Sequence, residues 1–185
     1  MAKSLERLRE VLRERQPEIL QEWLQVLLET YPQDSAHFFK RQKNQFANPV
    51  GHILETGLTN ALEHILFSDD NELVKDALDE LIRVRAVQDF SPAGALAFVF
   101  DLKGIVRAYC LDRIREEGLE EVLWHLDARI DEVALIAFNI YSSCREELAE
   151  IRINEVKSNV YFLLKRAKML VEEESPPGGV EYKKS

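Results

Sequence analysis

The sequence contains no glycine or proline between Leu119 and Glu174. These two residue types interrupt helices most strongly, so their absence allows a single helix through most of this stretch. The whole chain of 185 residues holds only 7 Gly and 6 Pro, too few for the many turns of an all-β protein. We therefore predict an all-α fold with a long C-terminal helix. Its first part carries apolar residues at helical spacing: Leu119, Val122, Leu126, Ile130, Val133, Ala137 and Ile140 or Tyr141.

The second part of this stretch has a heptad pattern. From Ala149, the apolar residues Ile153, Val156, Val160, Leu163, Ala167 and Leu170 follow at alternating spacings of four and three. Such a repeat is typical of a helix that pairs with another helix. Two arrangements fit it, a projecting or self-pairing coiled coil and a short helix that folds back on the bundle. We expect a dimer or output helix that uses Ile153, Val156, Val160, Leu163 and Leu170.

These patterns predict three segments. A helical bundle is expected over residues 1–143, an extension of the last helix over 144–171, and a disordered tail over 172–185. The tail contains the run Ser175-Pro-Pro-Gly-Gly, whose composition is typical of disorder.

Start and stop signals divide the bundle into helices. Pro17 suits a first helical turn, so one helix is predicted over Ser4–Arg15 and another from Pro17 to about Thr30. The polar segment Pro32–Ala47 is expected to be irregular, with one short turn at 35–41.

The remaining helices have clearer signals. Asn48-Pro49 and Ser91-Pro92 each combine an N-cap residue with proline at the first helical position, and they predict helices over 49–67 and 92–117. A helix over 72–88 lies between them. Gly118 is predicted to end the helix before it in a left-handed conformation.

Charge and composition limit the partners. The net charge of −9 disfavours binding to nucleic acid or anionic lipid. The apolar run Ala93–Phe100 is too short to cross a bilayer, and the charged N-terminus lacks a secretory apolar region. Cys110 and Cys144 form no metal or redox motif, and we interpret them as reduced thiols of a cytoplasmic protein.

Signatures of catalysis and cofactor binding are missing from the sequence. It has no glycine-rich phosphate loop, no HExxH and no Glu-x-x-His pair. We therefore expect no enzyme activity, no metal and no cofactor. The histidines are interpreted as surface residues rather than haem ligands: His37, His52, His64 and His125. His37 lies near Lys40, Arg41 and Lys43, in a basic cluster that is either a solvated loop or a contact for an acidic partner.

Small residues form a stripe along one predicted helix. Gly94, Ala97, Asp101, Gly104 and Ala108 follow at spacings of three and four. Glycine inside a helix costs about 1 kcal/mol relative to alanine, which suggests that a close approach requires it. A core crossing, a dimer seam and a ligand groove are the three interpretations.

Arg85 lies on an apolar stripe with Val74, Leu78 and Leu81. A guanidinium there must be paired or must extend to solvent. We predict that Asp101, on the next helix, pairs with Arg85, either as a structural ion pair or as a pair that senses an anion or ligand.

Several of these residues resemble a known family. The segment Arg83–Lys103, with Gln88-Asp-Phe-Ser-Pro92 at its centre, resembles the signature of the RsbRD N-terminal domain family, the sensor-type domain of RsbT co-antagonist proteins. Asn48–Gly51 and the helix end from Trp23 to Pro32 resemble its upstream landmarks. The resemblance covers roughly residues 15–140.

The resemblance implies a globin-like or related helical fold without haem. It also implies a dimeric, stressosome-like input module that passes signals through a long C-terminal helix to a STAS domain. No STAS domain follows in this sequence, so phosphorylation and kinase antagonism are not carried over, and a stand-alone sensor domain is expected. The resemblance also extends to lone domains linked to anaerobic respiratory and sulfur-reducing systems.

We therefore predict a non-catalytic, cytoplasmic sensory or regulatory domain that forms a homodimer. An unknown small ligand or a protein partner is expected to act through Arg85, Gln88, Gly94, Asp101 and Gly104. The alternative is a ligand-free adaptor whose C-terminal helix docks on a respiratory or regulatory protein. A cofactor-binding globin is a third reading.

Overall fold

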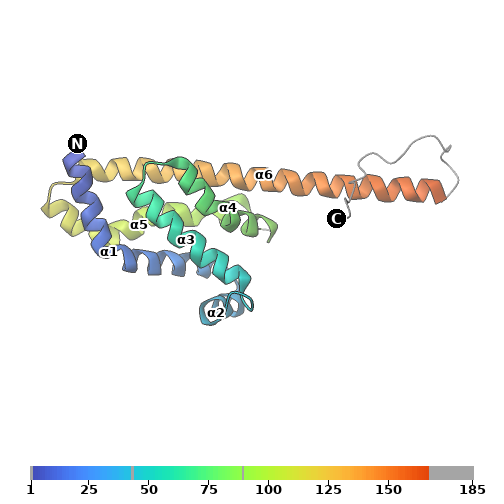
Figure 1. Cartoon of the computed structure of the whole chain (residues 1–185), viewed down its shortest axis with the longest axis horizontal. Helices are drawn as coiled ribbons and strands as arrows, with labels where there is room; N and C mark the ends of the chain where they lie inside the picture. Colours follow the sequence, from blue (N-terminus) through green and yellow to red (C-terminus); the bar gives the residue numbers. More distant parts are fainter. Residues whose placement is uncertain (1, 43, 89, 167–185) are drawn as a thin grey trace, which may run out of the picture. The chain divides into compact units, whose positions relative to one another are not determined.

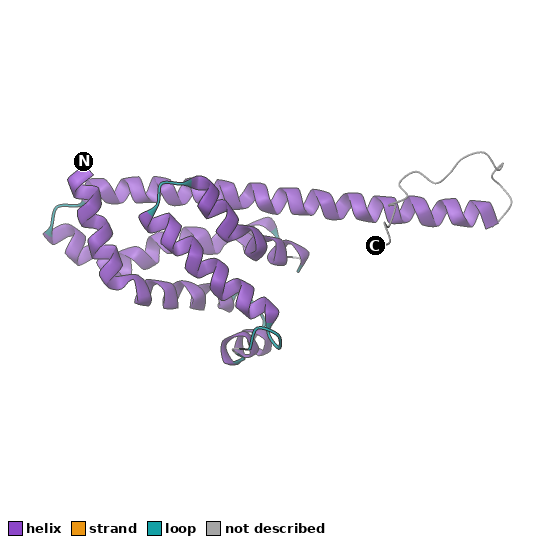
Figure 2. Cartoon of the chain, viewed as in Figure 1, coloured by secondary structure: helices purple, strands orange, loops and turns teal. Residues whose placement is uncertain are grey.

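The computed structural model describes residues 2–42, 44–88 and 90–166. Within these residues the chain forms six α-helices and no strand, which confirms the all-α prediction (Figure 1, Figure 2). The helices are α1 (Ala2–Glu29), α2 (Gln33–Arg41), α3 (Pro49–Phe67), α4 (Asn71–Val87), α5 (Pro92–Glu116) and α6 (Glu120–Arg166). The chain divides into two compact units, residues 1–142 and 143–185. Ala167, Leu170 and the tail predicted for 172–185 lie outside the described residues.

The predicted helix signals are confirmed where they are local. The Asn48 side chain accepts a hydrogen bond from the Gly51 amide at 2.9 Å, and Ser91 Oγ accepts one from the Gly94 amide at 3.1 Å. Gly118 has a φ of 66°, which ends α5 in the left-handed region that favours glycine. The continuous helix α6 confirms the prediction of a long C-terminal helix.

The predicted break at Pro17 is wrong. Helix α1 continues through Pro17, and Figure 1 shows that it changes direction along its length. Proline removes one helical hydrogen bond and clashes with the preceding turn, so it can bend a helix without ending it. Leu12 and Ile19, on either side of the proline, are both buried, so both parts of α1 pack into the core.

The segment predicted as irregular also contains a helix. α2 covers Gln33–Arg41 and begins with the Ala36 amide bonded to the carbonyl oxygen of Pro32 at 2.9 Å. One contact that holds α2 on the bundle is aromatic, because the rings of Tyr31 and Phe39 meet edge to face with centroids 5.3 Å apart. That contact depends on tertiary packing, which the local pattern does not encode.

The core of the first unit is built on two helix pairs, α1 with α5 and α3 with α4. The Trp23 indole donates to the carbonyl oxygen of Phe98 at 2.6 Å and fixes α1 against α5. Gly57 allows α3 and α4 to approach, because a Cβ there would lie 3.1 Å from the Ala77 carbonyl oxygen. Fully buried residues from the helices include Trp23, Leu27, Leu54, Leu58, Val74, Leu78, Phe98, Leu102, Ile130, Val133 and Ala137.

Candidate functional site

Arg85 is completely buried in the last turn of α4. Its Nη2 donates to the carbonyl oxygen of Gly94 at 2.8 Å and its Nε to that of Ala95 at 3.0 Å. Its Nη1 donates to Thr30 Oγ1 at 3.1 Å. One side chain therefore joins the ends of α1 and α4 to the first turn of α5. We call this arrangement the Arg85 clasp.

Aromatic rings complete the surroundings of this cation. The guanidinium carbon lies 4.2 Å from the ring centroid of Phe90 and 5.3 Å from that of Tyr31. Ring faces attract cations, and this attraction offsets part of the cost of burying the charge. Desolvation still lowers the pKa of Arg85 and raises that of the Tyr31 hydroxyl. The clasp is thus a satisfied, buried cation held by neutral groups.

The predicted pair between Arg85 and Asp101 is wrong. Among the described residues, the partners of Arg85 are carbonyl oxygens, a hydroxyl and ring faces, and Asp101 lies exposed on α5. The reason is the position of the contact along α5. Arg85 reaches the first turn of that helix, about two turns before Asp101. Partial desolvation raises the pKa of Asp101.

The stripe of small residues does not lie at a core crossing. Ala97, Asp101, Gly104 and Ala108 are exposed in the first unit, and a Cβ on Gly104 would meet no atom within 4 Å. Gly94 is half-buried, with its carbonyl in the clasp. The interpretations as a dimer seam and as a ligand groove stay predictions.

Gln88 follows α4 and is exposed, yet it contacts the surroundings of the clasp. The Tyr31 hydroxyl donates to Gln88 Oε1 at 3.0 Å. The Tyr141 hydroxyl, on α6, donates to the carbonyl oxygen of Phe90 at 2.6 Å. Through this hydrogen bond the clasp region contacts α6 within the first unit.

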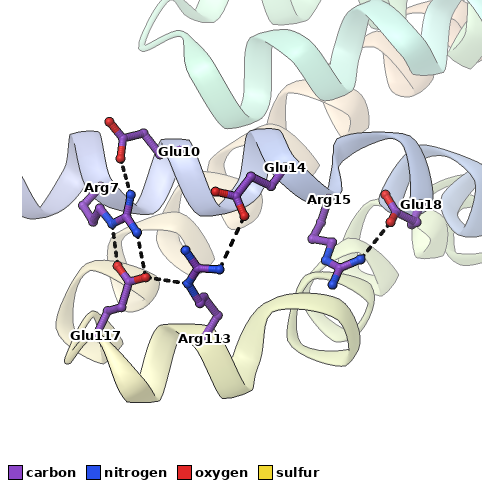
Figure 3. Close-up of polar contacts among 7 residues, drawn as sticks. All are labelled: Arg7, Glu10, Glu14, Arg15, Glu18, Arg113 and Glu117. Carbon is purple, nitrogen blue, oxygen red and sulfur yellow. Dashed lines mark hydrogen bonds and ion pairs between the residues drawn. The ribbon is translucent and has the colours of Figure 1, made fainter.

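A network of ion pairs fastens α1 to the end of α5 (Figure 3). Glu117 accepts from Arg7 Nε at 2.5 Å and from Arg113 Nε at 2.6 Å, and Arg113 also reaches Glu14 at 3.5 Å. The two guanidinium groups hold the pKa of Glu117 at about 2. Glu117 directly precedes Gly118, so the network holds the turn from which α6 begins.

Within the first unit, α5 and α6 expose large apolar side chains near the ion pairs that join the two helices. Two ion pairs join these helices, Lys103–Asp131 at 2.6 Å and Arg107–Asp127. The exposed apolar residues there are Phe100, Trp124, Leu135 and Phe138. Their exposure was not predicted, because only the apolar stripe expected to be buried was considered on each helix. Apolar residues outside the buried stripe of each helix were the sequence signal that could have predicted this exposed surface.

A second apolar stripe lies in the second unit. Ile153, Val156, Val160 and Leu163 are all exposed on α6, at the spacing that the heptad pattern predicted. We call these four residues the α6 stripe. The histidines lie where the sequence predicted them, with His37, His52 and His125 exposed and His64 half-buried.

The chain was compared with protein-family models, curated proteins and solved structures. Residues 17–156 match the family model of the RsbT co-antagonist protein rsbRD N-terminal domain. The chain belongs to this family. The match covers the Arg85 clasp, the turn at Gly118 and the first two residues of the α6 stripe, and it confirms the resemblance found in the sequence. No curated protein and no solved structure matches the chain.

As an RsbRD N-terminal domain, the chain belongs with the sensory input domains of RsbT co-antagonist proteins. No helix in the part of the chain that the structure describes is long and apolar enough to cross a membrane.

Proposed function

We propose that this RsbRD N-terminal domain is a non-catalytic, cytoplasmic sensory domain that acts as a homodimer and uses α6 as its output helix. The α6 stripe carries this proposal. Its four side chains, Ile153, Val156, Val160 and Leu163, are exposed by 51%, 61%, 48% and 65%. Apolar side chains exposed at heptad spacing are stabilised when a second helix covers them.

A second copy of the same helix suits this stripe. Ile153 and Val160 occupy the first core position of each heptad, and Val156 and Leu163 occupy the second. A β-branched residue at the first position with leucine at the second, as in Val160 and Leu163, favours a coiled coil of two parallel helices. Arg152 and Lys157 flank the stripe with like charge, so they would repel each other across a parallel pair. Apolar contacts would therefore hold the pair, which suits a modest, reversible association.

The first unit offers a further surface for a second copy. Exposed Phe100, Leu135 and Phe138 are accompanied by Gly104 and Ala108, whose small side chains allow another helix to approach closely. Exposed apolar groups of this kind on a protein surface are typical of interaction sites. We expect a second copy to cover this α5–α6 face.

In this proposal the Arg85 clasp has a coupling role rather than a ligand-binding one. Arg85 and Gly94 tie three helix ends together, while the hydrogen bond of Tyr141 to Phe90 connects that region to α6. A shift of α4 relative to α5 would therefore be transmitted to α6 at Tyr141, near the middle of the output helix.

The mass of the chain in solution tests the proposal. Native mass spectrometry and analytical ultracentrifugation of the full chain should show a dimer, and Val156→Glu and Val160→Glu should shift it to monomer. Asn154→Glu is the matched control, because it adds the same charge on the opposite face of the helix.

Two outcomes would contradict a homodimer held by the α6 stripe. One is a dimer that both stripe variants leave unchanged. The other is a chain that stays monomeric at every concentration, which would favour the ligand-free adaptor whose stripe docks on another protein.

A further inference from the structure

A cleft in the first unit combines apolar walls with two arginines. It has a volume of about 350 Å³ and lies between the start of α1, the end of α3 and the first half of α6. Pockets that hold small molecules start at about 300 Å³. Its apolar lining consists of Leu5, Leu8, Leu12, Ile65, Leu66, Val122 and Leu126.

Arg9 and Arg129 line this cleft from α1 and α6. Both hold the short connection between α3 and α4. Arg9 Nη2 donates to Asp69 Oδ1 at 3.0 Å, while Arg129 bonds to the Asn71 side chain and, at 3.4 Å, to the Asp70 carbonyl oxygen. The side chains are 23% and 13% exposed, so both guanidinium groups are largely removed from water.

Each of these arginines has an unused donor. Arg9 Nε and Arg129 Nε are buried and have no hydrogen-bond partner within the residues that the structure describes. Buried polar groups almost always have a partner, so two unsatisfied guanidinium nitrogens at one cleft are unusual. Both nitrogens lie beneath the surface of the cleft, so an oxygen that enters the cleft reaches them only when the arginine side chains move.

Two carboxylates and a histidine also lie at the cleft, and they affect which charged ligand it could bind. Asp69 is paired with Arg9, and Glu132 lies 3.6 Å from Arg129, so both carboxylates already face a guanidinium. His125 adds a further donor at the lining. Arginine binds planar carboxylates better than any other side chain, because its fork matches two oxygens.

We propose that this cleft binds an amphipathic monocarboxylate, with its head at Arg9 and Arg129 and its tail along the leucine wall. The volume corresponds to about a dozen waters at ~30 Å³ each, which suits a ligand of about a dozen non-hydrogen atoms. The site touches α1, the α3–α4 connection and α6, so occupancy would bear on the output helix. The regulatory role of this site rests on the proposed function, whereas ligand binding at the cleft does not depend on it.

Decanoate, with twelve non-hydrogen atoms, is the probe, and calorimetric titration of the full chain is the measurement. We expect saturable binding of decanoate, binding of decanol that is weaker by about tenfold or more, and no measurable binding of acetate. This pattern requires both the charged head and the apolar tail.

Two variants locate the ligand. Arg129→Gln should weaken decanoate binding about tenfold, because it removes the cation. Ala128→Trp should abolish binding by filling the cleft from an exposed lining position, without removing any polar contact. Arg115→Gln is the control for charge, since Arg115 is exposed and outside the cleft, and it should leave binding within about twofold.

The proposal is overturned if wild-type chain does not bind decanoate at millimolar concentration. It is also overturned if decanol binds equally well, or if Ala128→Trp and Arg129→Gln bind decanoate as wild type does. A variant that fails to fold is recognised by its melting curve, and the other variant then decides. The dimer experiment is independent of decanoate binding, so its result distinguishes failure of the proposed ligand site from failure of the proposed function.

Discussion

Arg85 Nη2 donates to the carbonyl oxygen of Gly94 at 2.8 Å, which joins the last turn of α4 to the first turn of α5. A cation is favoured at the end of α4 by the helix dipole and disfavoured at the start of α5. The hydrogen bonds from Arg85 to the Gly94 and Ala95 carbonyl oxygens offset the unfavourable dipole at the start of α5. Each of these oxygens has a second lone pair that the helical hydrogen bond does not use. The contact therefore fixes the angle at which α5 leaves α4.

Arg85→Ala should lower the free energy of unfolding by about 3 kcal/mol, because it leaves a cavity and removes three hydrogen bonds. Arg85→Met should cost less, about 1 kcal/mol, since an apolar chain of similar length fills the site without a buried charge. Exposed Asp101 provides the control, and Asp101→Asn should change stability by less than about 0.5 kcal/mol. Urea denaturation measures all three. A loss for Asp101→Asn as large as that for Arg85→Ala would contradict this account.

The sequence predicted features that depend on neighbouring residues. Asn48, Ser91 and Gly118 act within one helical turn, and each of these signals predicted its helix boundary correctly to within about a residue. The burial of Arg85 was also predictable, because its position on an apolar stripe is a local property of α4.

Features that depend on tertiary contacts were not predictable in the same way. Every residue has a backbone carbonyl, so the sequence does not indicate that Arg85 bonds to carbonyl oxygens, and a carboxylate partner was predicted instead. The two arginines of the cleft are 120 positions apart, at Arg9 and Arg129, and only the packing of α1 and α6 brings them to one cavity. Pro17 was misread because proline both begins and bends helices, and the neighbouring residues do not distinguish the two cases.

Glu117 should make stability depend on acid pH. Its pKa in the folded chain is about 2, below the ordinary 4.5 expected after unfolding, so the unfolded chain binds the proton more tightly. The stabilisation from the contacts with Arg7 and Arg113 is therefore fully present above about pH 4.5 and is lost as the pH falls towards 2. Glu117→Gln should melt below wild type at pH 7, and the gap should narrow through this window.

The control for this pH experiment is Glu116→Gln, which removes an equal charge from the exposed neighbouring position. Melting temperatures at pH 7, 5, 4 and 3 provide the comparison. A gap between Glu117→Gln and wild type that stays constant over the series would contradict the ion-pair account.

Cys110 should resist thiol reagents in the folded chain. It is 1% exposed, and burial raises the pKa of its thiol to about 11. At pH 8 only about one thiol in a thousand would then be ionised, and the thiolate is the reactive form. A cysteine introduced at exposed Asn154 is the positive control. Mass spectrometry of peptides after alkylation distinguishes Cys110 from Cys144, and rapid native labelling of Cys110 would show that α5 opens readily.

Gly104 and Gly118 should respond in opposite directions to the same substitution. Gly104 lies inside α5 with no atom within 4 Å of an added Cβ, so Gly104→Ala should raise the free energy of unfolding by up to about 1 kcal/mol. Gly118 has a φ of 66°, where a side chain is strained, so Gly118→Ala should lower it by about 1 kcal/mol.

Chemical denaturation at low protein concentration gives both values for the monomer. If a second copy packs closely on the α5–α6 face, Gly104→Ala should also weaken dimerisation in ultracentrifugation while it stabilises the monomer, because the added methyl group separates the two helices. A variant that stabilises the chain and leaves the dimer unchanged would exclude Gly104 from the contact.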